Sequence, residues 1–150
     1  MKKAILTIGN TLRGDDGITS YLGKLIEGEE SLDWKIFYGE DVPESQFHKI
    51  REYEPDLVVV ADAMTGMKIG QVEVIDISNE RDYMYSTHNL PAPILMSYLK
   101  GFCKSVLFLG LTVDLENVLE INENISKEAE ITARNALKKV FEIDSIFDND

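Results

Sequence analysis

The sequence has very little cysteine, no long apolar run and no recognisable leader, and each shortage excludes a class of protein. Cys103 is the single cysteine, so the chain cannot form an internal disulfide, and this fits a reducing compartment. The longest apolar runs, such as residues 57–61, are far too short to span a bilayer. The residues after the N-terminal lysines lack the small-residue cleavage site of a signal peptide. We therefore expect a cytoplasmic protein without membrane insertion.

Basic residues are also scarce. The formal net charge is −12, from 27 acidic and 15 basic residues. A field of this sign disfavours binding to nucleic acid and to anionic membrane surfaces. It favours a basic or metal-bearing partner, although solubility alone also explains an acidic surface. We expect no nucleic-acid partner.

Apolar segments of strand length alternate along the chain with amphipathic segments of helix length. The pattern predicts strands at 3–9, 33–38, 56–61, 70–77 and 104–111, and helices at 17–28, 43–53, 90–102 and 126–143. The seven-residue link at 63–69 is too short for a parallel crossover, so the fourth strand is expected to be an antiparallel edge strand. This order predicts an α/β fold, a three-layer α/β/α sandwich around a mostly parallel, mixed sheet of about five strands. We expect one domain over 1–150, with 144–150 as a flexible acidic tail.

A glycine-bracketed loop at 9–17 follows the first expected strand and contains two adjacent aspartates, Asp15 and Asp16. In many α/β proteins, the ligand-binding and catalytic residues lie in loops at the carboxyl ends of the strands. A phosphate-binding loop needs a lysine or free backbone donors, and two aspartates would repel a phosphate. The loop is therefore suited to hold a cation or a proton, although Asp16 could also simply cap the following helix.

Three polar side chains stand at comparable places in the expected sheet. Asp16 follows the first strand, Asp62 follows the third, and His88 precedes the third helix. Because the ends of successive parallel strands meet at one edge, these side chains can converge. Two carboxylates and an imidazole suit nickel or zinc, with water completing the shell. Each residue also has a structural alternative: Asp62 could cap a turn, and His88 could cap the next helix or have no role.

Four short motifs follow one another along the chain. They are Gly9-Asn10-x-Leu12-x-Gly14-Asp15-Asp16-Gly17, Val60-Ala61-Asp62-Ala63, Ser86-Thr87-His88-Asn89-Leu90-Pro91 and Leu109-Gly110-Leu111-Thr112-Val113-Asp114. In this order and at this spacing they resemble the signatures of the [NiFe]-hydrogenase maturation endopeptidases. The resemblance covers nearly the whole chain and is strongest to the branch that serves the large subunit of hydrogen-evolving, formate hydrogenlyase-type hydrogenases.

The resemblance implies an aspartyl-type endopeptidase that removes the C-terminal extension of a [NiFe]-hydrogenase large-subunit precursor after nickel insertion. It implies the phosphorylase/hydrolase-like version of the fold and no permanent cofactor, because the nickel is carried by the substrate; another divalent ion could substitute in the site. Carried over by motif, Asp16, Asp62 and His88 would be the metal ligands and the catalytic residues. A metal-activated water or a carboxylate could then attack the peptide bond. The residues expected to contact substrate are Asn10, Asp15, Gly39, Thr87 and Asn89.

Two positions depart from the family pattern. Thr19 stands where a second glycine is frequent, so we expect a less closely packed helix start. Tyr38 stands where many members have aspartate, so any role of that carboxylate would be vacant or would pass to Glu40 or Asp41.

Two other functions remain open from the residues alone. A non-catalytic nickel-binding or hydrogenase-assembly chaperone would use the same three side chains without cleaving anything. A flavodoxin-like nucleotide-binding domain would have the same order of elements, but the acidic first loop and the missing phosphate-binding lysine count against it. The absence of Gly-x-Ser-x-Gly and His-Glu-x-x-His argues against an α/β-hydrolase and a zincin.

Overall fold

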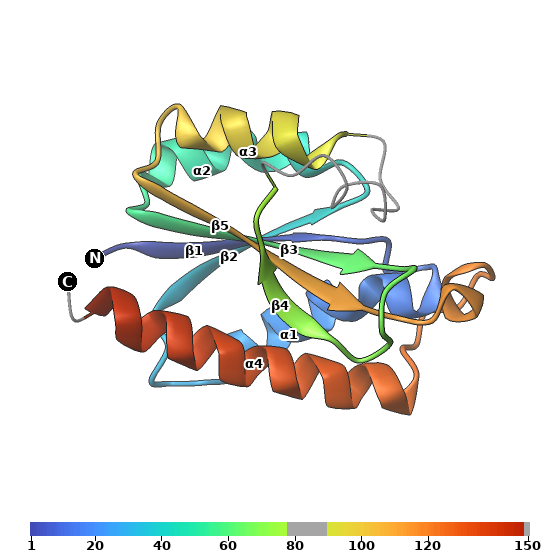
Figure 1. The fold of residues 1–150 in the computed structure, drawn as a ribbon. Coiled ribbons are helices and arrows are strands. Elements are labelled where there is room, and N and C mark those ends of the chain that lie inside the picture. The colour runs from blue at the N-terminus through green and yellow to red at the C-terminus, as the bar shows by residue number, and fades with distance from the viewer. Residues whose placement is uncertain (78–89, 149–150) are drawn as a thin grey trace.

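A five-stranded sheet forms the centre of the molecule (Figure 1). The structure, a computed structural model, describes residues 1–77 and 90–148. The strands are β1 (Lys3–Ile8), β2 (Trp34–Glu40), β3 (Leu57–Met64), β4 (Val72–Ile75) and β5 (Ser105–Thr112). Their spatial order is β2-β1-β3-β5-β4, and β4 alone is antiparallel to its neighbour among these strands. The predicted mostly parallel sheet with an antiparallel edge strand is confirmed.

Helices cover both faces of this sheet, which confirms the three-layer architecture (Figure 1). The helices α1 (Ile18–Glu27) and α4 (Lys127–Asp148) pack on one face, and α2 (Phe47–Tyr53) and α3 (Ala92–Lys100) pack on the other. Three short 3-10 turns complete the described elements: η1 (Gly14–Gly17), η2 (Pro43–Gln46) and η4 (Leu115–Val118). None of the described helices has the length and apolar character needed to cross a membrane.

The central strand β3 shows why this sequence needs both helical layers. All eight of its residues are buried. Val58 and Val60 pack with the α2 and α3 side, whereas Val59 and Ala61 pack with the α1 and α4 side. Successive side chains of a strand point to opposite faces, so a continuous apolar run is stable only when both faces are covered.

The C-terminal helix is longer than the sequence pattern predicts. α4 continues to Asp148, so the expected flexible tail at 144–150 is wrong for residues 144–148. Lys3, in β1, is 4% exposed and pairs with Asp144 at 2.7 Å and also with Asp148. Trp34 Nε1–H donates to the same Asp144 carboxylate at 2.8 Å. A buried ammonium group needs such partners, and they attach the last turns of α4 to the sheet.

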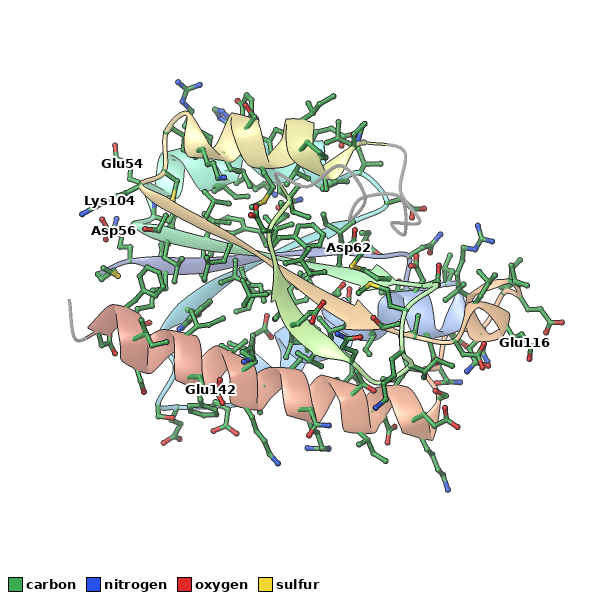
Figure 2. The ribbon with its side chains drawn as sticks, in the orientation of Figure 1. Glu54, Asp56, Asp62, Lys104, Glu116 and Glu142 are labelled. Atoms are coloured by element: carbon green, nitrogen blue, oxygen red, sulfur yellow. The ribbon has the colours of Figure 1, made fainter. Side chains whose placement is uncertain are left out.

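The strand order places a crevice beside the carboxyl end of β1. The chain passes from β1 to β2 on one side and then crosses to β3 on the other, so the connections leaving β1 and β3 diverge. In open α/β sheets, ligands bind where the strand order reverses in this way. Asp62 and Glu116 lie toward this edge, whereas Glu54, Asp56 and Lys104 lie at the opposite edge (Figure 2).

Candidate active site

The loop after β1 folds back so that Asp16 lies in a cleft at the carboxyl edge. Gly9 has φ +151°, and a Cβ built on it would lie 1.9 Å from the Asp16 carbonyl oxygen, so only glycine fits there. The Asn10 backbone N–H donates to Asp16 Oδ2 at 2.7 Å, and Asp16 is 4% exposed. The cleft has a volume of about 160 Å³. Its lining residues are Arg13, Asp16, Asp41, Leu115, Val118 and Leu119.

Asp62 lies inside β3, because the strand runs on to Met64. The expectation that Asp62 follows the strand is therefore wrong. The extension arises because 63–64 continue to pair with β5, a long-range contact that the local pattern does not show. Asp62 pairs in register with Ile8, the last residue of β1, and it is 2% exposed. Since β3 also contacts η1, Asp62 and Asp16 belong to the same edge of the sheet.

The third predicted ligand cannot be placed beside these two carboxylates. His88 lies outside the described residues, as do Thr87 and Asn89, so these three assignments stay predictions. Within 1–77 and 90–148, no group of three or more His, Cys, Asp or Glu side chains is arranged to hold a metal ion. The described part of the chain therefore supplies two of the three predicted ligands, both carboxylates, and oxygen donors of this kind suit a divalent cation when a further ligand is added.

Asp15 and Asp16 are adjacent but have different partners. Asp15 is 3% exposed, and its carboxylate accepts hydrogen bonds from the Ser126 N–H at 2.6 Å, the Ser126 hydroxyl at 2.7 Å and Asn117 Nδ2 at 3.2 Å. The Ser126 hydroxyl in turn accepts the Ala129 N–H at 3.1 Å, which confirms Ser126 as the N-cap of α4. Asp15 therefore joins the loop at 9–17 to the start of α4. Its substrate contact stays a prediction.

An irregularity at the end of β2 brings two further acidic residues to this loop. The register with β1 shifts between Thr7 and Ile8, and Glu40 has φ +50°. Asn10 Nδ2 donates to Asp41 Oδ2 at 2.9 Å, and the Thr11 hydroxyl donates to Glu40 Oε1 at 2.9 Å. Bulges often re-aim side chains beside functional sites. Here the irregularity places Asp41 in the cleft that Asp16 lines.

The structure shows how both departures from the family pattern are accommodated, and it contradicts the expectation for Thr19. Thr19 is fully buried, and its hydroxyl donates to the Ile8 carbonyl at 2.8 Å, so the expected loose helix start is wrong. Tyr38 faces α1, where its hydroxyl donates to Glu27 Oε1 at 2.7 Å, and burial together with this contact raises its pKa. Gly39 has a steric reason to be glycine, because a Cβ there would lie 2.8 Å from the Thr7 carbonyl oxygen.

A larger cavity of about 450 Å³ lies on the other side of the loop, between α1, β2 and residues 123–125. No sequence motif indicates this cavity, because its walls come from separate segments. Lys24 stacks on Tyr38 there, with its Nζ 4.7 Å from the ring centroid. The full lining is Thr11, Gly17, Ser20, Tyr21, Lys24, Tyr38, Glu40, Glu123, Asn124, Ile125 and Glu130.

Comparisons with known proteins find relatives over most of this chain. The chain is 31% identical to the hydrogenase 3 maturation protease of Escherichia coli K12 over 117 residues, which is 77% of this chain and 75% of that protein. It is 29% identical to the solved [NiFe] hydrogenase maturation protease HycI of Thermococcus kodakarensis, with a TM-score of 0.78 and coverage of 95% and 91%. A solved, uncharacterized protein of Wolinella succinogenes is 46% identical, with a TM-score of 0.82 and coverage of 98% and 99%.

No protein-family model matches the sequence. The family is shown instead by the relatives: the identity to the E. coli protease extends over most of both chains, and the same fold is found in the solved maturation proteases. The chain therefore belongs to the hydrogenase maturation proteases and is a peptidase.

Proposed function

We propose that this peptidase removes the C-terminal extension of a [NiFe]-hydrogenase large-subunit precursor after nickel has been inserted. The observation that supports the site is the position of Asp16 and Asp62, two buried carboxylates at the carboxyl edge of the sheet. The relatives named as hydrogenase maturation proteases support the reaction class and favour it over a chaperone or a nucleotide-binding domain. The single cysteine and the absence of a membrane-spanning helix among the described residues are consistent with our proposal that it acts in the cytoplasm.

We propose that the substrate's nickel is the recognition element and that Asp16, Asp62 and His88 bind it. Two carboxylates at one edge repel each other, and a divalent cation between them replaces that repulsion with attraction. A precursor without nickel would bring no such cation, so the peptidase would act only on the loaded form. The nickel belongs to the substrate, and the peptidase then needs no stored cofactor.

Binding of the nickel would hold the scissile bond at the cleft, where hydrolysis needs an activated water and a stabilised oxyanion. The nickel could lower the pKa of a water molecule, or a carboxylate could take its proton. Asp41 is the second carboxylate of the cleft, and the Asn10 side chain holds it in place. The cleavage rate of Asp41→Asn, measured at several pH values, separates the two routes. If Asp41 is the general base, the variant should lose the acidic limb of the pH–rate profile. If the nickel activates the water, that limb should remain.

The decisive experiment incubates the purified protein with nickel-loaded and nickel-free precursor and measures intact masses. We expect the wild type to shorten only the loaded precursor. Asp16→Asn, Asp62→Asn and His88→Ala should each lower the rate by about a hundredfold or more. Asp33→Asn, an exposed aspartate at the opposite edge, is the control and should retain full activity.

Full activity in all three folded variants would refute the site. Equal cleavage of loaded and nickel-free precursor would refute nickel recognition. Stable binding of precursor without any loss of mass would favour the chaperone.

A further inference from the structure

Five large apolar side chains are exposed on the loops that surround the Asp16 cleft. They come from the loop after β1, the turn after β2, and the segment at 114–122. We call them the apolar rim: Leu12, Val42, Leu115, Leu119 and Ile121. Their exposed fractions run from 50% for Val42 to 90% for Ile121, so the residues that the structure describes cover little of this surface. Exposed apolar side chains that gather around a cleft are typical of a protein-binding surface.

The rim is held by hydrogen bonds between its segments. The Asn122 N–H donates to the Leu12 carbonyl at 2.9 Å, and the Gly14 N–H donates to the Asn122 carbonyl at 2.6 Å. Arg13 Nε donates to the Val118 carbonyl at 3.3 Å. These bonds join the loop at 9–17 to the segment at 114–122, so the rim is organised before a partner binds, which lowers the entropy cost of association.

The 3-10 turn η4 shows that this exposure does not come from an unpacked loop. Val118 is 6% exposed and belongs to the core on the α1 and α4 side. The Asp114 carboxylate caps the turn by accepting the Glu116 N–H at 3.1 Å. Leu115 and Leu119, on either side of Val118, are 52% and 60% exposed. A single anchored turn therefore buries one apolar side chain and presents two others to solvent.

The rim is continuous with the candidate active site. Leu115 and Leu119 line the same cleft as Asp16 and Asp41. A protein whose peptide bond reaches Asp16 must cover these two leucines, because they form the wall of the entrance.

Charge around the rim is almost all of one sign. The segments 9–17, 40–46 and 114–124 contain nine acidic residues, and Arg13 is their single basic residue. A partner that covers the rim would meet apolar side chains within a negative field, which attracts lysine and arginine.

We propose that the apolar rim is the docking surface for the protein substrate, and that it binds an apolar segment of the precursor flanked by basic residues. This inference rests on the proposed function, because it assigns the surface through which that substrate is held. The rim supplies binding area and the acidic segments supply long-range attraction. The cleft between them receives the scissile bond.

The test compares two double variants, each of which replaces two exposed apolar side chains without changing charge. Leu119→Gln/Ile121→Gln alters the rim. Ile131→Gln/Ile146→Gln alters two exposed isoleucines of α4, which are 63% and 61% exposed and lie outside the rim. With nickel-loaded precursor as substrate, we expect the rim variant to raise KM about tenfold, with a much smaller change in kcat. The α4 variant should match the wild type.

A third variant, Glu116→Gln/Glu120→Gln, tests the charge. We expect its KM to rise and to depend less steeply on salt than that of the wild type. An unchanged KM and an unchanged salt dependence would overturn the basic character assigned to the partner segment.

The outcomes separate this inference from the proposed function. If the wild type cleaves loaded precursor and the rim and α4 variants have equal KM values, the inference is overturned and the function stands. If the wild type cleaves nothing, the proposed function falls, and the Kd for the same precursor tests the docking surface alone. A tenfold weaker affinity of the rim variant, with the α4 variant unchanged, supports the docking surface. Equal Kd values overturn it. A dimer of the free protein that the rim variant dissolves would show that a second copy occupies the surface, and would also overturn it.

Discussion

Asp15 and Asp16 are adjacent, but mutation of each should affect a different property of the protein. Asp15 accepts three hydrogen bonds inside the chain and anchors the Ser126 cap of α4. Asp16 accepts a hydrogen bond from the Asn10 backbone N–H and lines the cleft. We therefore predict that Asp15→Ala lowers stability, whereas Asp16→Asn lowers cleavage with little effect on stability.

The magnitude for Asp15→Ala follows from its three donors. A hydrogen bond to a charged group contributes about 1.5–3 kcal/mol. The Asn117 side chain belongs to an exposed residue, so water replaces its bond at little cost. Ser126 is half-buried, and its two donors together should account for about 3 kcal/mol. For a chain of this size, that loss lowers Tm by about 6–12 °C.

The assay is urea unfolding monitored by circular dichroism. The m value, which is the slope of the free energy of unfolding against urea concentration, is compared between variants. Asp16→Asn keeps an acceptor for the Asn10 N–H and should stay within about 1 kcal/mol of the wild type. Asp15→Asn keeps one acceptor oxygen and should fall between the two. An Asp15→Ala protein as stable as the wild type would refute the anchoring role. If that variant also failed to cleave precursor while remaining fully stable, Asp15 would belong to the substrate site, as the family resemblance implies.

Three further predictions concern the sheet and its helices. Burial raises the pKa of Asp144, but hydrogen bonds from Lys3 and Trp34 outweigh it, and the pKa lies below its ordinary value of 3.8. At pH 7, the free energy of unfolding of Asp144→Asn should therefore be about 2 kcal/mol below that of the wild type. Urea unfolding at decreasing pH should show this difference shrink below pH 3.8 and vanish as the pH falls through the folded-state pKa of Asp144. A difference that stays constant with pH would exclude the Asp144 charge as its cause. Gly39→Ala should lower the free energy of unfolding by about 2 kcal/mol, because its Cβ would press on backbone atoms of two neighbouring segments, and an unchanged urea midpoint would contradict this. Burial raises the pKa of the Cys103 thiol, so iodoacetamide at pH 8 should alkylate it slowly in the folded protein and rapidly in urea, and equal rates would contradict the buried position.

The elements of the fold could be predicted because the sequence signals are local. The apolar run of β3 requires a strand covered on both faces, and the short link before β4 requires an antiparallel edge. The end of α4 could not be predicted in this way. Its last turns are held by Lys3, more than 140 residues away along the chain. No pattern within an acidic tail indicates such a partner.

The candidate site was predictable where one motif contained the whole signal. The glycine-rich loop and the aspartate of β3 were found from their motifs, and the structure places Asp16 and Asp62 at one edge. Asp15 could not be separated from Asp16 by sequence, because its partners lie in the segment at 117–126. The family pattern predicts a loose helix start at Thr19, but the Thr19 hydroxyl donates a hydrogen bond to the carbonyl of Ile8. Side-chain hydrogen bonds of this kind depend on tertiary contacts that periodicity does not report.

We propose that Asp16, Asp62 and His88 together bind the nickel that the substrate carries. A crystal of the protein soaked in a nickel salt tests it most directly, with anomalous scattering measured at the nickel edge. We predict one ion bound by both carboxylates and the imidazole, beside the cleft that Leu115 and Leu119 line. An ion bound elsewhere would contradict this assignment. So would an imidazole that points away from the two carboxylates while they bind nickel without it.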